Sequence, residues 1–480
     1  MTQLKVGLEK VYPIYIGGKW SNTKETYPLE FPYNGEVVTN VALATTKEAE
    51  EAVDSAISAK KVMAELPLWK RAEILNRAAD LLIERQDALA ELMVYETGKI
   101  FRDTKTEIAR SASTLRFAAD AARALQGDMI PIDAMKGGEG RLMFTIREPI
   151  GVIGAITGFN FPLLLAAHKV GPAIAGGNPT VLKPAPQTPL SSFELARIFE
   201  EAGLPKGGLS VITGDVEVGE YLVKHPNVPV ISFTGSSEVG KRISEIARYK
   251  KVLLELGSNS ATIIDKDSNI DYAIDRCVVG GFGASGQSCI SVQRVYVHKE
   301  YYEEFLERLA AKINNLKIGN PFDEDTDVST LISFEATSRV SGWVREAVES
   351  GARLLAGGEV KGRILEPTLL ADVTSDMKVS CEEIFGPVIV VSPFESFTNV
   401  VDLVNDSRYG LQTGVFTNNI NNAFYAIKNI ESGGININEI PSFRADHMPY
   451  GGVKDSGIGK EGPKYSLEEM TVEKLVSFRI

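Results

Sequence analysis

Cys289 has the clearest potential for covalent chemistry. It lies in segment 286–290 (GQSCI), a glycine-containing turn that follows an apolar stretch and precedes a β-like run over 292–297. A thiolate is the reactive form of cysteine, and backbone N–H groups at an element end can lower its pKa and hold an oxyanion. A single cysteine is more often just a small apolar residue, an interpretation that we keep for Cys277 and Cys381.

Five other motifs accompany the cysteine segment. They are 157–162 (TGFNFP), 182–184 (LKP), 233–236 (FTGS), 254–257 (LELG) and 382–387 (EEIFGP). In this order and spacing, the six motifs closely resemble the aldehyde dehydrogenase superfamily. The resemblance extends from 15–20 (YIGGKW) to 449–457 (PYGGVKDSG), which is nearly the whole chain.

The resemblance implies a catalytic set of Cys289, Asn160 and Glu255. The Cys289 thiolate would attack an aldehyde, and the Asn160 amide together with the Cys289 N–H would hold the resulting oxyanion. Hydride transfer would leave a thioester, and Glu255 would activate the water that hydrolyses it. From its apolar strand end alone, Glu255 could also be one half of a salt bridge. Ser258 replaces the second glycine of the usual motif, which we expect to be a harmless variation.

No classical Gly-x-Gly-x-x-Gly fingerprint is present, and segment 233–240 is the nearest substitute for holding a pyrophosphate at a helix start. The resemblance places cofactor contacts at Ile156, Thr157, Lys183, Pro186, Phe233, Gly235, Ser236, Val239, Leu256, Glu383 and Phe385. NAD-preferring relatives often carry a glutamate at the position of Pro186, where it would repel a 2′-phosphate. We therefore expect either NAD or NADP to serve.

Three side chains match substrate-pocket positions of the family: Arg110, His168 and Arg444. Guanidinium groups bind carboxylate, phosphate or sulfonate through directed hydrogen bonds, and an apolar aldehyde would leave them unpaired. The combination resembles the branch that oxidises lactaldehyde, glyceraldehyde 3-phosphate, phosphonoacetaldehyde, sulfolactaldehyde or succinate semialdehyde. The predicted substrate is a short aldehyde with a hydroxyl or anionic group.

Composition excludes several other classes of protein. The 51 basic and 63 acidic residues give a net charge of −12, which argues against a general nucleic-acid binder. Three scattered cysteines and four histidines form neither a disulfide framework nor a zinc motif, so no metal is expected. Residues 1–12 lack an apolar signal-peptide core, and no apolar run approaches membrane-spanning length. We expect a cytoplasmic protein.

Hydrophobic periodicity predicts an α/β fold. Helices are expected over 48–62 and 71–95. Strands at 152–156, 180–182, 209–212, 230–233 and 252–256 then alternate with helices at 191–202 and 237–248, the first of these with a capping box from Ser191 to Glu194. This alternation predicts a Rossmann-type parallel sheet that is covered on both faces, with its ligand at the strands' C-terminal ends.

A second alternation follows Cys289, with strands at 292–297 and 388–391 and a helix at 300–316, and it predicts a second α/β domain. Segments 128–132 and 142–146 read as a hairpin, which is marginal alone and so is expected to pair with another strand. In the family such a hairpin and the C-terminal strand form an oligomerisation element, which implies a homodimer or homotetramer. The predicted division is a cofactor domain at 1–126 and 148–257, a catalytic domain at 258–455, and an oligomerisation element at 127–147 and 456–480.

Two other functions compete with hydrolytic aldehyde oxidation. A CoA-acylating dehydrogenase would resolve the thioester with coenzyme A, and the presence of Glu255 at the position of the base argues against it. A catalytically silent relative would keep the fold for binding or structure. The joint presence of Cys289, Asn160, Glu255, Lys183 and Glu383 argues against that alternative.

Overall fold

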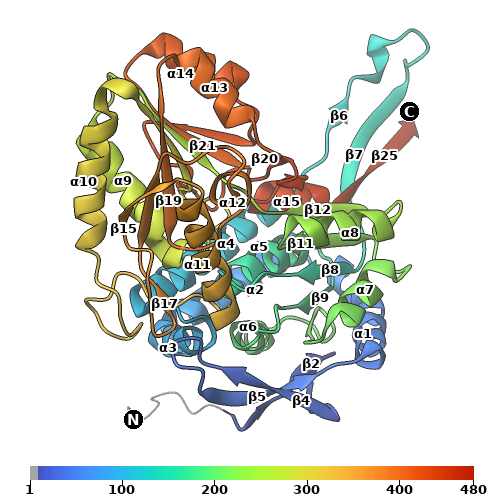
Figure 1. Ribbon diagram of the computed structural model, residues 1–480. Helices are drawn as coiled ribbons and strands as arrows, with labels where there is room; N and C mark the ends of the chain where they lie inside the picture. Colours follow the sequence, from blue (N-terminus) through green and yellow to red (C-terminus); the bar gives the residue numbers. More distant parts are fainter. Residues whose placement is uncertain (1–8) are drawn as a thin grey trace.

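The computed structural model describes residues 9–480 (Figure 1), and an eight-stranded sheet forms the centre of its first part. The strand order is β24-β12-β11-β8-β9-β10-β2-β3. The five inner strands run parallel: β12 (Lys251–Glu255), β11 (Val230–Thr234), β8 (Ile153–Ile156), β9 (Thr180–Lys183) and β10 (Leu209–Val211). Antiparallel β24 (Gly457–Ile458), β2 (Ile14–Ile16) and β3 (Lys19–Ser21) complete the edges. The predicted parallel sheet is confirmed.

Helices cover both faces of this sheet. The helices are α1 (Thr46–Glu65), α2 (Leu68–Glu84), α3 (Gln86–Thr97), α4 (Phe101–Arg123), α5 (Pro162–Ala175), α6 (Leu190–Glu201), α7 (Val216–Lys224) and α8 (Ser237–Ala247). Alternate residues of one strand enter different cores, since Leu182 packs with α2, α4 and α5 whereas Val181 packs with α1 and α7. Such two-sided burial is what makes these strands continuous apolar runs.

Two predictions about these helices are wrong. The helix expected over 71–95 is two helices, α2 and α3, because Arg85 leaves the helical conformation between them. The helical spacing of apolar residues continues across the break, because α2 and α3 each bury one face in the same core. The expected capping box from Ser191 to Glu194 is also absent. Instead, α6 begins at Leu190, and the buried Glu96 carboxylate accepts hydrogen bonds from Leu190 N (2.7 Å) and Ser191 N (3.2 Å).

A seven-stranded sheet organises the second part of the chain. Its order is β15 (Arg353–Ala356), β18 (Thr368–Ala371), β19 (Val388–Phe394), β14 (Arg294–His298), β13 (Ala261–Ile264), β21 (Gln412–Phe416) and β22 (Gly434–Ile437), and only β15 is antiparallel. Helices α9 (Ile270–Phe282), α10 (Tyr302–Asn314), α11 (Phe334–Glu349), α13 (Phe397–Asn405) and α14 (Ile420–Asn429) pack around it (Figure 1). The second α/β unit was predicted, and α10 occupies the interior of the helix expected at 300–316.

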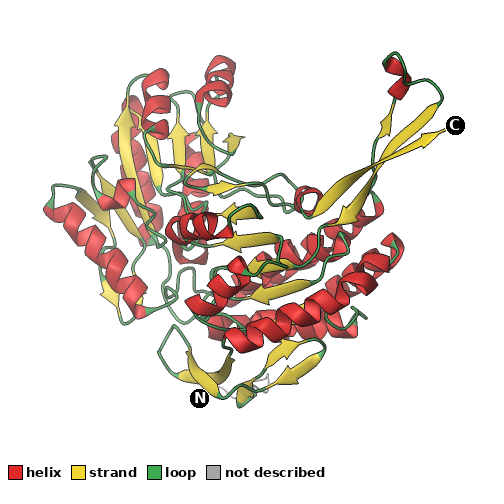
Figure 2. Ribbon diagram, turned by 90° about the vertical axis from the view of Figure 1, so that its right-hand side faces the viewer, coloured by secondary structure: helices red, strands yellow, loops and turns green. Residues whose placement is uncertain are grey.

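The predicted hairpin projects from the body of the molecule (Figure 2). It consists of β6 (Met129–Ile130) and β7 (Arg141–Pro149), and the C-terminal strand β25 (Thr471–Arg479) pairs with β7 along its whole length. The expectation that the hairpin pairs with another strand is therefore confirmed. Leu475 and Phe478 on β25 are more than half exposed.

The shorter elements are β1 (Val11–Tyr12), β4 (Glu25–Glu30), β5 (Val37–Leu43), β16 (Val360–Lys361), β17 (Ile364–Leu365), β20 (Tyr409–Gly410), β23 (Val453–Lys454), α12 (Lys378–Cys381) and α15 (Pro463–Glu469). Between residues 9 and 480, no helix is long and apolar enough to cross a membrane. In the same residues, no group of three or more His, Cys, Asp or Glu side chains could hold a metal ion.

Candidate active site

A cavity of about 550 Å³ lies at the C-terminal ends of β11 and β12. Its walls also include residues of α4, the segment before α5, the turn before Cys289, and the loop that runs from Ile440 to Tyr450. The sheet topology predicted a ligand site at this edge. Cys289, Asn160 and Glu255 all line the cavity, so the fold brings the predicted catalytic set together.

The turn that presents Cys289 has an unusual backbone. Ala284, Ser285 and Gly286 have φ values of 50°, 56° and 72°, in the left-handed region that non-glycine residues rarely adopt. Two partners outside the turn hold it in place: Asp103 Oδ2 accepts from Ala284 N at 3.2 Å, and Ser285 Oγ donates to Ser329 O at 3.0 Å. Backbone strain of this kind persists where surrounding contacts enforce it, commonly at active sites.

Gly286 has to be glycine for a second reason. A Cβ at this position would lie 2.1 Å from the carbonyl oxygen of Gly386, which is backbone and cannot move aside easily. The turn therefore packs directly against the segment that carries Glu383 and Phe385. The glycine of the cysteine motif brings the nucleophile segment and the Glu383 segment into contact.

The Cys289 side chain is partly buried, and among the described residues its one hydrogen-bond partner is Tyr450. Its Sγ lies 3.0 Å from the hydroxyl oxygen of Tyr450. Desolvation raises the pKa of the thiol above its ordinary value, and the hydrogen bond from Tyr450 and the charge of Arg444 act in the opposite direction. Reaction of the thiol therefore requires removal of its proton.

Asn160 reaches the nucleophile turn from the other side of the cavity. Its Nδ2 donates a hydrogen bond to Gln287 O at 2.9 Å. Gln287 is itself fixed, because its Oε1 accepts from Ile332 N at 2.9 Å. A primary amide carries two N–H groups, so one Asn160 donor remains for an oxyanion beside Cys289.

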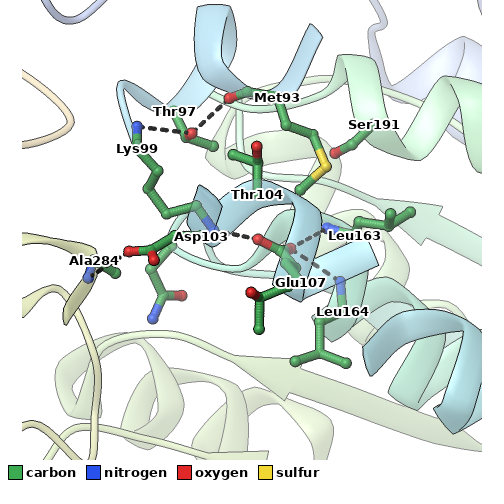
Figure 3. A network of polar contacts seen from close by, with 12 residues as sticks. Met93, Thr97, Lys99, Asp103, Thr104, Glu107, Leu163, Leu164, Ser191 and Ala284 are labelled. Carbon is green, nitrogen blue, oxygen red and sulfur yellow. Dashed lines mark hydrogen bonds and ion pairs between the residues drawn. The ribbon is translucent and has the colours of Figure 1, made fainter. Parts of the chain in front are cut away.

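Helix α4 contacts both the start of α5, next to Asn160, and the turn before Cys289 (Figure 3). The buried Glu107 carboxylate accepts hydrogen bonds from Leu163 N (3.0 Å) and Leu164 N (3.1 Å) in the first turn of α5, and its other oxygen pairs with Lys99. Asp103, one helical turn before Glu107, binds the cysteine turn at Ala284. A single helix therefore positions the segment next to Asn160 and the turn before Cys289 relative to each other.

Sequence reasoning missed Asp103, Glu107 and Lys99. A signal was present, because Glu107 lies beside Ile108 in the apolar stripe that continues to Leu115 on the same helix. A carboxylate in a buried stripe needs a partner, and here the partners are backbone N–H groups at the positive end of another helix.

Glu255 ends β12 and is buried, and its Oε2 has no hydrogen-bond partner in the part of the chain that is described. Burial and the neighbouring Glu461 raise its pKa well above the ordinary value, while Arg444 and Lys169 partly oppose the shift. Asp103, Glu107 and Glu383 also line the cavity, but among the described residues only Glu255 of these four keeps a buried carboxylate oxygen without a hydrogen-bond partner. Glu255 thus has the properties of a general base at neutral pH.

Glu461 is a second buried carboxylate that the sequence did not reveal. It lies between two cations, with Lys169 Nζ 3.3 Å from its Oε1 and Arg444 Nη2 2.8 Å from its Oε2. These cations hold its pKa well below the ordinary value, in contrast to Glu255. The environment therefore drives the pKa values of two neighbouring carboxyl groups apart, a pattern that separates acid and base roles in enzymes.

The predicted substrate residues do not all lie where we expected. Arg110 and Arg444 line the cavity, but His168 is fully buried on α5, with its Nε2 3.1 Å from Arg444 Nη2. His168 therefore does not line the cavity, contrary to the expectation of a substrate-pocket residue. Asn160 lies two residues before α5, and the helical turn of α5 directs the His168 ring into the core, where it contacts Arg444.

The arginines are also not free, contrary to expectation. Arg110 forms a two-point pair with Asp446, at 3.2 Å from Nε to Oδ2 and 2.7 Å from Nη2 to Oδ1. Arg444 donates to Glu461 and stacks over the ring of Tyr450, with 3.8 Å from Cζ to the ring centre. The Nε of Arg444 nevertheless remains buried without a partner within residues 9–480.

The predicted cofactor residues fit a dinucleotide. Gly235, Ser236, Leu256, Glu383 and Phe385 line the cavity, whereas Ile156, Thr157, Lys183, Pro186, Phe233 and Val239 lie outside its lining. Ser236 caps α8, since its Oγ accepts from Val239 N at 3.3 Å. A Cβ on Gly235 would come within 2.4 Å of the Phe233 ring, so the backbone just before α8 can take this path only with glycine at position 235.

The other cofactor positions supply unsatisfied polar groups. The Lys183 side chain, at the end of β9, is mostly buried and makes no hydrogen bond or salt bridge among the described residues, and burial lowers its pKa to about 8. The Thr157 hydroxyl, which follows β8, is buried and unpartnered in that part of the chain. Pro186 is exposed. A buried hydroxyl without a partner is uncommon, and a ribose or phosphate would satisfy it together with the Lys183 ammonium.

Glu383 and Phe385 form another part of the cavity wall. Glu383 Oε1 accepts from Ser258 N at 2.9 Å, and burial raises its pKa to about 7. The ring of Phe385 meets that of Phe159 edge-on, with centres 5.6 Å apart. Ser258 has no positive φ. A serine is therefore compatible with the backbone here, and its N–H fixes Glu383.

Comparison with known proteins identifies the family. The model of the aldehyde dehydrogenase family matches residues 20–476. The 3-sulfolactaldehyde dehydrogenase of Priestia aryabhattai is 44% identical over 97% of this chain and 98% of its own length. The chain belongs to the aldehyde dehydrogenase family.

Solved structures agree with the sequence relatives. Aldehyde dehydrogenase 21 from Physcomitrella patens, in complex with the reaction product succinate, superposes with a TM-score of 0.96 at 38% identity, over 98% of this chain and 99% of that one. Glyceraldehyde-3-phosphate dehydrogenase GapN from Methanocaldococcus jannaschii, complexed with NADP, gives 0.92 at 38% identity, over 95% and 100%. The expected fold class is confirmed.

Proposed function

We propose that this protein oxidises a short anionic or hydroxylated aldehyde to its carboxylic acid, with NAD or NADP as the oxidant and Cys289 as the nucleophile. The observation that carries the proposal is one cavity lined by Cys289, Asn160, Glu255 and Arg444. A thiol, a neutral oxyanion donor and a buried base suit covalent acyl chemistry, and membership of the aldehyde dehydrogenase family favours aldehyde oxidation among such reactions.

The chain's residues account for each protein-side step. The Cys289 sulfur, once deprotonated, forms a bond to the aldehyde carbon, and the carbonyl oxygen becomes an oxyanion that the second Asn160 N–H and the Cys289 N–H hold. A bound nicotinamide would supply the oxidant, since loss of the hydride of that carbon to it would convert the adduct on Cys289 to a thioester. Glu255 then takes a proton from water as the water attacks the acyl carbon, and the sulfur leaves with the electron pair of the C–S bond.

Lys183, Thr157 and the start of α8 would hold the dinucleotide, and Glu383 would contact its nicotinamide end. The buried, unpartnered Thr157 hydroxyl supports this assignment, as does the Lys183 side chain, which makes no hydrogen bond or salt bridge among the described residues. The exposed Pro186 offers no carboxylate against a 2′-phosphate. We therefore propose that both NAD and NADP are accepted.

The free Nε of Arg444 supports an anionic or hydroxylated substrate. A charge-assisted hydrogen bond to a buried guanidinium is worth about 1.5–3 kcal/mol. Arg110, which Asp446 holds in place through a hydrogen bond, would bind the substrate at the same end of the cavity. The substrate of one relative, sulfolactaldehyde, and the product of another, succinate, are of the same chemical kind.

A panel of aldehydes tests the proposal through the absorbance of reduced nicotinamide. Short anionic and hydroxylated aldehydes should give the largest kcat/KM, and neutral aliphatic or aromatic aldehydes much smaller values. A preference for neutral aldehydes contradicts the substrate assignment. Turnover that requires coenzyme A instead identifies the acylating alternative, and no turnover with any aldehyde identifies a silent relative.

We also propose a homodimer or homotetramer formed through the projecting sheet of β6, β7 and β25. The exposed apolar side chains of β25 support it, because single exposed strands with such side chains are usually covered. Light scattering of the protein and of a Leu475→Lys variant tests this, and a wild-type monomer would contradict it.

A further inference from the structure

The hydroxyl of Tyr450 contacts Cys289 and makes no other hydrogen bond among the described residues. Its hydroxyl oxygen lies 3.0 Å from Cys289 Sγ, and this sulfur is its one hydrogen-bond partner among the described residues. The side chain is almost fully buried. A buried tyrosine hydroxyl usually finds a backbone or side-chain oxygen, so a sulfur as its sole partner needs an explanation.

The ring of Tyr450 is fixed from two sides. The backbone groups of Tyr450 and Glu461 bond each other in both directions, at 3.0 and 2.6 Å. The guanidinium of Arg444 lies over the ring face, 3.8 Å from its centre. The hydroxyl therefore stays aimed at Cys289 without relying on the weak hydrogen bond to sulfur.

We propose that Tyr450 is a catalytic residue of this site, whose hydroxyl donates a hydrogen bond to the Cys289 sulfur whenever that sulfur carries negative charge. The inference deepens the proposed function and rests on Cys289 as its nucleophile. A hydrogen bond to a charged acceptor is about twice as strong as one to a neutral acceptor, so the contact favours the thiolate over the thiol.

The direction of donation follows from the surroundings. Burial and the neighbouring Cys289 raise the pKa of Tyr450 well above its ordinary value, so the phenol keeps its proton and acts as a donor and not as a base. The thiol proton must go to a different acceptor. Cys289 is only partly buried, so that proton can leave to solvent in the cavity.

Two steps of the reaction place negative charge on the sulfur. In the first, the thiol loses its proton to a base before the sulfur attacks the aldehyde carbon. In the second, water has added to the thioester, the C–S bond breaks, and the sulfur leaves with the electron pair. The Tyr450 hydroxyl can donate to the same atom in both steps without transferring its own proton.

The charged groups around the thiol come from several elements. Glu255 from β12 and Glu383 from the segment after α12 raise the pKa of Cys289, and Arg444 lowers it. Replacing Tyr450 by phenylalanine removes a hydroxyl and leaves all three charges and the ring in place. The change therefore isolates the hydrogen bond.

The test measures alkylation of Cys289 by iodoacetamide against pH, with the modified peptide quantified by mass spectrometry. Tyr450→Phe should move the midpoint of the profile upward by about one pH unit, which is tenfold in the acid constant, and slow labelling at neutral pH by a similar factor. Tyr302→Phe is the matched control, since it removes a buried hydroxyl that bonds Asp372 far from the cavity. It should leave the profile unchanged.

A second substitution guards against a folding defect in Tyr450→Phe. Fluorotyrosine at position 450 is a stronger donor of the same shape, and it should move the midpoint downward. An unchanged midpoint in both variants overturns the proposal, and so does a shifted midpoint with unchanged kcat. Labelling needs no substrate, so it separates this inference from the proposed function, which fails if Cys289→Ala retains turnover.

Discussion

Replacing Glu107 by glutamine should lower activity although the side chain is not expected to touch substrate. Glu107 binds two N–H groups at the start of α5 and pairs with the buried Lys99. Glutamine keeps an acceptor for the N–H groups but leaves the lysine without a counter-charge. A buried ion pair that loses one partner destabilises a protein by about 3–5 kcal/mol.

The effect should reach the chemistry through Asn160, three residues before Leu163. A catalytic group misplaced by about 1 Å can lower the rate by about 10²-fold. The oxyanion exists only in the transition state and the adduct, so we expect kcat and kcat/KM to fall together with little change in KM. Thermal unfolding and steady-state kinetics of the same preparation measure both effects.

Glu96→Gln is the matched control for Glu107→Gln. Glu96 is also a buried carboxylate that accepts two N–H groups at a helix start, but that helix is α6, which does not carry a predicted catalytic residue. Its kcat should match that of wild type. Adding Lys99→Met to Glu107→Gln should recover stability, since both charges are then gone. Equal losses of kcat in Glu107→Gln and Glu96→Gln would refute the positioning role of α4.

Three further substitutions test the assigned roles. Glu255→Gln should give a burst of reduced nicotinamide followed by slow turnover, and a parallel fall of burst and turnover would contradict this role. The variant should also lose the decline of the deacylation rate at low pH, because a base with a raised pKa loses function as pH falls through that pKa. Pro186→Glu should lower kcat/KM for NADP relative to NAD, and an unchanged ratio would mean that this residue does not face the 2′ position. Arg444→Ala should raise KM for an anionic aldehyde by about tenfold or more, from the loss of one charge-assisted hydrogen bond, and an equal loss for a neutral aldehyde would contradict the substrate assignment.

The sequence predicted the parts of the site that lie in local motifs. Cys289, Asn160 and Glu255 each occur in a short motif at the end of a strand or turn, and the sheet topology then brings those ends to one cavity. The alternation of strands and helices likewise predicted both sheets, because two-sided burial leaves a clear apolar pattern.

The groups that support these side chains were not predictable in the same way, because their partners are distant in the chain. Cys289 and Tyr450 are 161 residues apart, and Lys169 and Glu461 are 292 apart. Such pairs depend on how distant parts of the chain pack against each other. A local sequence pattern does not predict that packing. For the same reason Arg444 seemed free in the sequence, whereas the fold supplies Glu461 as its partner.

The position of His168 shows a different limit. Helical spacing after Asn160 correctly placed it on α5, but α5 is buried all around, so the period does not distinguish the cavity side from the core side. Only the packing of α4 and the Arg444 loop against α5 determines where this ring lies.

The central claim is that oxidation proceeds through a thioester on Cys289 that Glu255 helps to hydrolyse. The most direct measurement is the mass of peptides from Glu255→Gln protein that has been mixed with an anionic aldehyde and NAD or NADP and then quenched in acid. The account predicts that the acyl group accumulates on the peptide containing Cys289. Formation of reduced nicotinamide while that peptide stays unmodified, or an acyl group on another residue, would contradict it.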